Sequence, residues 1–205
     1  MYSFSSKIKL TALISMIVGL VAVIYSFIAT PSSVADLHQG GEAAHDPAHL
    51  EHMLHMLQNK PWAALYVAAL FFLLISLGVL AFYAINRAAQ AGWAPILFRV
   101  MEGITGYLPV GALIFFVLLV CSGLHLNHLF IWMDPQVVAH DTVIQGKTGY
   151  LNVPMFLVRA AVYLLGWISY RQITRKLSLQ QDEATDNRPF INAFKWSAGF
   201  LVFFL

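Results

Sequence analysis

The sequence predicts an all-α, polytopic transmembrane helix bundle. Of the 205 residues, 59% are hydrophobic and only 11% are charged, whereas an ordinary globular domain has about 25% charged residues. A soluble domain of this length has too little interior to hide so much apolar surface. The apolar residues also form continuous runs with no period of two, which favours helices over the strands of a membrane barrel.

Four apolar segments are long enough to cross a bilayer, which takes about 20 residues. We expect these spans at about 8–29, 61–86, 103–131 and 150–171. A fifth apolar segment, 190–205, begins near Phe190 and is still apolar at Leu205. The sequence therefore predicts one membrane domain over residues 1–205, with four complete spans and an incomplete fifth, truncated at its C-terminus as part of a longer protein.

The first segment resembles a signal peptide in having Lys7 and Lys9 before its apolar run. The apolar core of a signal peptide is about 7–15 residues long, however, and this run is longer. Bulky Phe27 also stands where the best cleavage site would need a small residue. These features favour an uncleaved membrane anchor.

The third segment is preceded by apolar residues from Pro95 onward. A single helix from Pro95 to Ile131 would be about 55 Å long, too long for an upright span. We therefore expect a short interfacial helix over 94–102, followed by a bend, with Pro109 kinking the third span.

The basic residues predict the orientation of the chain. The N-terminal tail and the four connections contain 2, 1, 2, 1 and 4 lysines and arginines in turn. Because basic loops stay in the cytoplasm, we expect a cytoplasmic N-terminus, with loops 30–60 and 132–149 on the periplasmic side of a bacterial inner membrane. The net charge of +2, without a basic run, excludes nucleic-acid binding through a basic face.

Four histidines with helical spacing lie in the first loop: His45, His49, His52 and His55. Imidazoles four residues apart on a helix can bind zinc or copper. Alternatively, the four histidines belong to a solvated helical collar and titrate near pH 6.5. The polar, Gly- and Ala-rich surroundings favour the solvated collar, and the metal site is the weaker alternative.

Three ionisable side chains stand out in or beside the spans. Arg99 and Glu102, three residues apart, can form an ion pair, and a carboxylate at the mouth of a span also suits proton entry. Arg159 lies about 14 Å past Tyr150 along a helix, which places it near the middle of the membrane. An arginine at that depth marks a functional site or a structural ion pair, unless it snorkels to the interface.

His125 and His128 are expected on one face of the third helix, near its outer end. They could be ligands of a b-type haem, members of a proton path, or interfacial anchors. A bis-histidine haem needs a ligand on another helix, and no other span contains a histidine. The single cysteine, Cys121, excludes an iron–sulfur cluster held by this chain alone and a covalent c-type haem.

Several longer motifs go beyond these patterns. They are LFRVMEGIT (97–105), GLHLNHLFIWMDP (123–135), AHD (139–141) and GYLNVP (149–154). The chain resembles, over nearly all of its length, the ActF-type (NrfD/PsrC-like) membrane subunit of alternative complex III, a bacterial quinol:cytochrome c oxidoreductase. The histidine-rich loop followed by QNKPWAALY (58–66) is similar to the Bacteroidetes branch.

The resemblance implies two four-helix bundles in the complete protein. It also implies partner subunits: cytochromes c with haem c, an iron–sulfur subunit, a sister NrfD-like subunit that carries the menaquinol site, and a terminal oxidase. This chain would then bind no cofactor and supply no catalytic residue, although it would offer a proton path. The positions that fall in matching motifs, and are therefore candidates for that path or for buried charges, are Arg99, Glu102, His125, His128 and Arg159.

The expected function is that of a non-redox subunit, embedded among lipids, which scaffolds a respiratory quinol:cytochrome c oxidoreductase and relays protons. One alternative is a b-haem, quinone-reactive membrane anchor of another oxidoreductase. The other is a purely structural scaffold subunit.

Overall fold

The computed structural model describes residues 5–33 and 47–204. Within these ranges the chain forms α-helices and short 3-10 turns and contains no strand, which confirms the all-α fold class. Four helical stretches are long and apolar enough to cross a membrane: Ser6–Ile28, Met53–Ala88, Pro95–Gly123 and Val153–Glu183. The chain is therefore a helical membrane protein.

The chain divides into two compact units. One comprises residues 1–65 and 127–130, and the other comprises 66–126 and 131–205. The first unit contains α1 (Ser6–Ile28), which buries no residue and exposes apolar side chains along its length. Such a surface suits a helix that is solvated by lipid tails.

Helix α3 (Pro47–Ala88) starts earlier than the expected second span and continues through Pro61. Two backbone hydrogen bonds cap its C-terminal end: Gln90 N–H donates to the Arg87 carbonyl (3.2 Å), and Ala91 N–H donates to the Asn86 carbonyl (3.0 Å). This is a Schellman motif, with Gln90 in the left-handed conformation (φ 51°).

The apolar stretch from Pro95 onward is divided as expected. Helix α4 (Pro95–Ile104) is followed by a 3-10 turn, η1 (Thr105–Tyr107), and then by α5 (Leu108–Gly123). Pro109 lies in the first turn of α5, where a proline needs no N–H partner. The break therefore lies before Pro109, and α4 is a separate short helix.

Helix α5 ends at Gly123, and the predicted continuation to residue 131 is wrong. Leu126 N–H donates to the Cys121 carbonyl and His125 N–H to the Ser122 carbonyl, both at 3.1 Å. His125 has a φ of 58°. The chain thus leaves the helix through a second Schellman motif.

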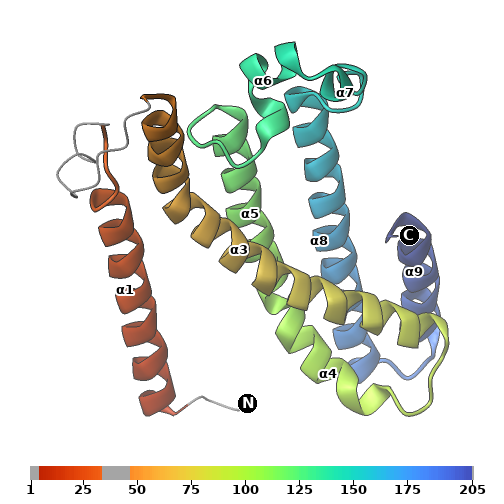
Figure 1. Ribbon diagram of the computed structural model, residues 1–205. Coiled ribbons are helices and arrows are strands. Elements are labelled where there is room, and N and C mark those ends of the chain that lie inside the picture. Colours follow the sequence, from red (N-terminus) through yellow and green to blue (C-terminus); the bar gives the residue numbers. More distant parts are fainter. Residues whose placement is uncertain (1–4, 34–46, 205) are drawn as a thin grey trace. The chain divides into compact units, whose positions relative to one another are not determined.

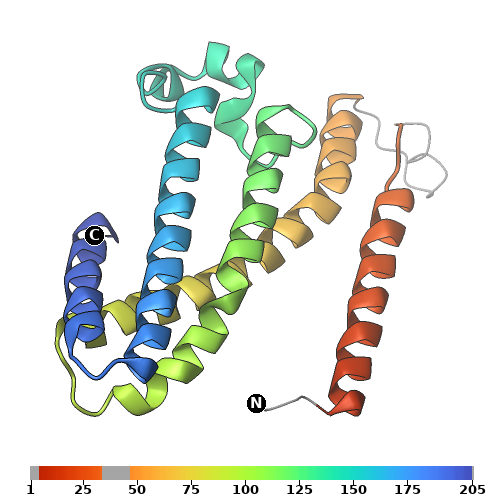
Figure 2. The same ribbon diagram turned by 180° about the vertical axis from the view of Figure 1, so that it is seen from behind.

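The expected outer connection contains a 3-10 turn and two short helices: η2 (Ile131–Met133), α6 (Pro135–His140) and α7 (Thr142–Gln145). The Asp141 carboxylate caps α7 by accepting from the backbone N–H groups of Val143 (2.8 Å) and Ile144 (3.2 Å). Figures 1 and 2 show α6 and α7 at one end of the neighbouring helices α5 and α8 (Val153–Glu183).

Helix α8 begins three residues later than the expected fourth span and continues past its expected end at 171, to Glu183. The Asn152 side chain caps it by accepting from Met155 N–H at 2.9 Å. Arg171 and Arg175, which the sequence suggested were part of a loop, therefore lie on a helix. The fifth segment is α9 (Arg188–Phe204), and it packs along α8.

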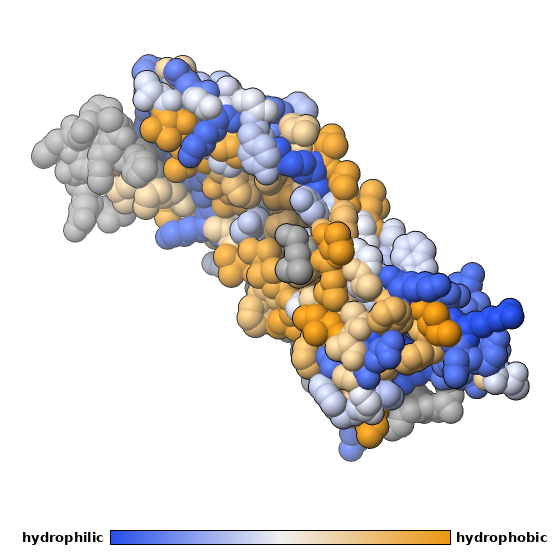
Figure 3. Space-filling view, turned by 90° about the vertical axis from the view of Figure 1, so that its right-hand side faces the viewer, coloured by the Kyte–Doolittle hydropathy of each residue, from blue (hydrophilic) through white to orange (hydrophobic). Residues whose placement is uncertain are grey.

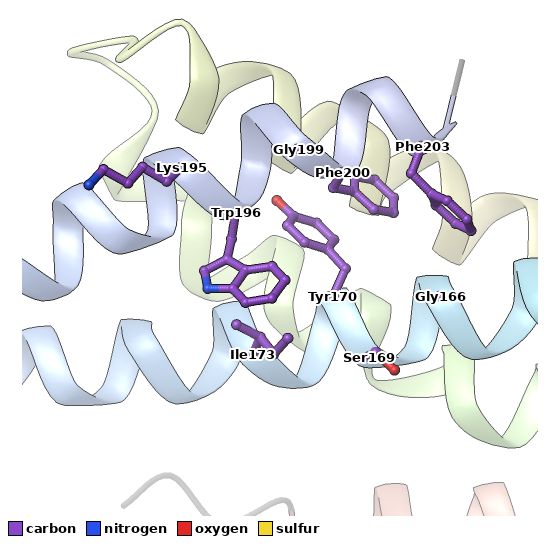
Figure 4. A pocket seen from close by; sticks show the side chains of 9 residues that line it. All are labelled: Gly166, Ser169, Tyr170, Ile173, Lys195, Trp196, Gly199, Phe200 and Phe203. Carbon is purple, nitrogen blue, oxygen red and sulfur yellow. The ribbon is translucent and has the colours of Figure 1, made fainter.

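Ring stacking joins α8 and α9. The rings of Tyr170 and Phe200 lie parallel with their centroids 3.9 Å apart, and the Tyr170 hydroxyl lies 2.8 Å from Ser197 Oγ. Beside this pair lies a largely apolar groove of about 510 Å³ (Figure 4), where Trp196 and Phe203 lie on the α9 side.

The core of the second unit is formed by α3, α5, α8 and α9, with Leu73, Leu80, Leu108, Leu164 and Phe200 among its buried residues. On the face shown in Figure 3, apolar side chains cover much of the middle, and hydrophilic side chains gather toward the two ends. This distribution suits helices that cross a membrane.

Candidate functional site

The candidate site is centred on Glu102, a carboxylate in the last turn of α4. Glu102 is 7% exposed. Phe98 and Met101 form the buried face of this helix, within the second unit, and Glu102 is buried together with them. A buried carboxylate is costly unless it is paired and hydrogen-bonded, so its partners determine what the site can do.

Two arginines from different helices contact this carboxylate. Arg99 Nη1, one turn earlier on α4, donates to Glu102 Oε2 at 3.1 Å, as the i, i+3 spacing predicted. Arg175 Nη1, on α8, donates to the same oxygen. Arg99 also forms an ion pair with Asp182, whose side chain is 60% exposed, and donates to the Ser178 carbonyl at 3.3 Å. A continuous chain of charged groups therefore leads from the surface to the buried carboxylate.

The other carboxylate oxygen faces α3. Tyr83 Oη donates to Glu102 Oε1 at 3.4 Å and accepts from Arg87 Nε at 3.2 Å. Tyr83 and Arg87 are one helical turn apart and both buried. Glu102 thus connects α3, α4 and α8 in one polar network, which we call the Glu102 network: Tyr83, Arg87, Arg99, Glu102, Arg175 and Asp182.

A small cavity adjoins the network. It has a volume of about 10 Å³, close to the lower limit for one water molecule, and its lining includes Glu102, Thr105, Arg171 and Arg175. A water molecule there would contact the carboxylate and the neighbouring hydroxyl and guanidinium groups. Chemically, the arrangement holds a carboxylate that can bind and release a proton next to a solvent-linked chain of polar groups.

Arg159, the third charged candidate, lies outside this network. It occupies the second turn of α8, so the expected position halfway along a span is wrong, because the helix begins only at Val153. Its guanidinium group reaches back to the Tyr150 carbonyl (Nη2 to O, 2.9 Å) and lies 3.7 Å from the centroid of the Tyr150 ring. The side chain thus runs back toward the start of α8, and its Nη1 is buried without a hydrogen-bond partner in the described part of the chain.

The two histidines of the third segment do not share a helix face, since both follow the end of α5. His125 is exposed. His128 belongs to the first unit, where its backbone N–H donates to Asn59 Oδ1 at 2.9 Å and its ring lies 5.1 Å from that of His55. The expectation that both histidines lie on one face of the third helix is therefore wrong.

The histidines of the first loop are only partly described. His49, His52 and His55 lie on α3, as their helical spacing predicted, whereas His45 lies outside the described residues. In the part of the chain that the structure describes, no group of three or more His, Cys, Asp or Glu side chains could hold a metal ion.

Sequence reasoning identified Arg99 and Glu102 but missed Tyr83, Arg87 and Arg175. Local spacing reveals a pair on one helix, whereas partners on α3 and α8 depend on tertiary packing. Nothing in the sequence marked Arg175, because the burial of Thr174 and Ser178 on the same stretch of α8 is known only from the structure.

In comparisons with known proteins, no protein-family model matches the chain, and no curated protein matches it.

Proposed function

We propose that this chain is a membrane subunit of a respiratory quinol:cytochrome c oxidoreductase of the alternative complex III type, where it scaffolds the assembly and relays protons. The observation that carries this proposal is the placement of Glu102, a buried carboxylate connected through Arg99 to exposed Asp182. Arg99 and Glu102 both fall in the motif 97–105, which resembles that family.

A proton role is favoured by the two ends of the Glu102 network. Asp182 is accessible to solvent, whereas Glu102 is buried beside a cavity near the size of one water molecule. In our proposal, protons reach Glu102 from the surface by way of bound water and leave toward the membrane interior through groups of the complete complex. Quinol oxidation and the haem and iron–sulfur centres belong to partner subunits.

The same network also supports the second candidate, a purely structural scaffold. Its ion pairs and hydrogen bonds join α3, α4 and α8, and hydrogen bonds to a charged group typically contribute about 1.5–3 kcal/mol. The two functions differ in what a neutral isostere does. In Glu102→Gln the amide oxygen can still accept a hydrogen bond from Tyr83, but the side chain cannot carry a proton. In a complex that assembles, this variant therefore impairs the proton role and leaves the structural role intact.

Membership of the complex is tested by affinity purification of the tagged, full-length protein from membranes of its native host. We expect co-purification of cytochrome c subunits, an iron–sulfur subunit and a second NrfD-like subunit, together with quinol:cytochrome c reductase activity. Purification without these partners would contradict the proposal. A b-haem spectrum of the isolated chain would favour the membrane-anchor alternative instead.

A further inference from the structure

A second feature of the structure, independent of the proposed function, lies at the opposite end of the Glu102 network from Asp182. Arg87, in the last turn of α3, is 7% exposed. Among the described residues it forms no ion pair with a carboxylate, and its only hydrogen bond is from Nε to Tyr83 Oη at 3.2 Å. A buried guanidinium without a counter-ion is costly.

Aromatic rings hold this guanidinium in place. Its central carbon lies 4.1 Å from the ring centroid of Phe98, on α4, and 5.8 Å from that of Phe190, on α9. Cation–π contacts partly offset the desolvation of an arginine, but they use the faces of the guanidinium plane and leave its N–H groups available. Within the described chain, no acceptor is bonded to Nη1 or Nη2.

A pocket of about 80 Å³ adjoins the same groups. Its lining includes Asn86, Arg87, Gln90, Pro95, Phe98 and Phe190. It is several times larger than the space needed for one water molecule, about 10–15 Å³. Pro95 is the first residue of α4, so the positive end of that helix dipole also adjoins the pocket.

We propose that this pocket binds a phosphate group, with the two terminal nitrogens of Arg87 donating to its oxygens. The planar fork of arginine matches phosphate bidentately, and an anion supplies the counter-charge that the described chain lacks. The surroundings fit the phosphate of an anionic phospholipid, because Trp93, in the turn before α4, and Ile96, on α4, are exposed apolar residues next in sequence to the lining residues Gly92 and Pro95, as suits a membrane interface. Inorganic phosphate offers the same chemistry.

The test uses the full chain in detergent and variants at position 92, which lines the pocket. A Cβ added to Gly92 meets nothing within 4 Å, so Gly92→Gln and Gly92→Glu should both fold, and only the second places a negative charge at the pocket. Arg87→Gln removes the proposed ligand group itself, and Arg188→Gln, at an exposed position, is its control.

Binding is measured by native mass spectrometry with phosphatidylglycerol or phosphatidylcholine, and by thermal shift with inorganic phosphate against chloride at equal ionic strength. We expect wild type, Gly92→Gln and Arg188→Gln to retain phosphatidylglycerol in preference to phosphatidylcholine. Gly92→Glu and Arg87→Gln should bind phosphatidylglycerol at least about tenfold more weakly than wild type does. If inorganic phosphate stabilises wild type and the two control variants but not Gly92→Glu or Arg87→Gln, the phosphate group alone is sufficient for binding. Equal retention of phosphatidylglycerol by wild type and Gly92→Glu, without a phosphate effect, would overturn the proposal.

Discussion

Arg175 on α8 forms an ion pair with Glu102 on α4, 73 residues earlier in the chain. This pair fixes the end of α8 against the short helix α4, and Tyr83 extends the same network to α3. A single buried carboxylate thus connects three helices, and in the proposed function it is also the group that exchanges a proton.

The first prediction concerns stability. Glu102→Ala leaves Arg99 and Arg175, whose side chains are 40% and 39% exposed, without their carboxylate and should lower the free energy of unfolding by about 1.5–3 kcal/mol. The matched control is Asp186→Ala, which breaks the exposed pair between Asp186 and Arg188 (3.3 Å). Exposed pairs contribute about 0–1 kcal/mol. Thermal unfolding of the detergent-solubilised variants measures both effects, and equal losses would show that the Glu102 network is not a structural centre.

Much of the fold follows from composition, since long apolar runs have one stable solution in lipid, the helix. The break before α5 could also be predicted, because a straight helix from Pro95 onward would exceed the bilayer. The end of α5 could not. A Schellman motif at His125 has no glycine at its left-handed position to reveal it, and leucines continue beyond Gly123 between the polar residues His125, Asn127 and His128.

The candidate site was predictable only where its members lie one turn apart. Arg99 and Glu102 meet through helix periodicity alone. Arg175 was not identified because three basic residues near 171–176 suggested the end of a span, whereas the helix itself continues to Glu183. Arg159 was assigned the wrong position for a related reason, namely that the start of α8 depends on the Asn152 cap.

The second prediction tests the left-handed conformation of His125. The left-handed conformation costs a non-glycine residue about 1–2 kcal/mol. Glycine removes this cost but raises the conformational entropy of the unfolded chain, which offsets part of the gain. His125→Gly should therefore stabilise the protein by up to about 1 kcal/mol. Leu124→Gly is the control. Leu124 has a φ of −88°, so glycine there should only destabilise. A loss of stability in His125→Gly, measured by thermal unfolding, would contradict the assigned helix end.

The third prediction concerns Arg159. Arg159→Leu removes both the hydrogen bond to the Tyr150 carbonyl and the ring contact, and should destabilise the protein by about 1.5–3 kcal/mol. Tyr150→Ala removes only the ring and should cost about 0.5–1 kcal/mol. Thermal unfolding compares the two variants. An unchanged stability in Arg159→Leu would mean that the contact with Tyr150 contributes nothing.

The fourth prediction concerns the orientation expected from the basic residues. In a Cys121→Ser background, cysteines placed at Ser33 and Thr142 should react with an impermeant thiol reagent from the periplasmic side. A cysteine at Gly92, between α3 and α4, should react only after the membrane is opened. The opposite pattern of labelling in intact cells would reverse the proposed topology.

The most direct test of a proton role for Glu102 is the turnover of the assembled complex that contains Glu102→Gln. Gln keeps an acceptor for Tyr83 but cannot carry a proton, and proton transfer by a positioned group typically contributes 10²–10⁴-fold to a rate. We predict that the variant complex assembles, as judged by native gels, and that its quinol-driven proton uptake per complex falls at least about tenfold, whereas Asp186→Asn has no effect. Wild-type proton uptake in an assembled Glu102→Gln complex would contradict the proton role and leave Glu102 as a structural residue only.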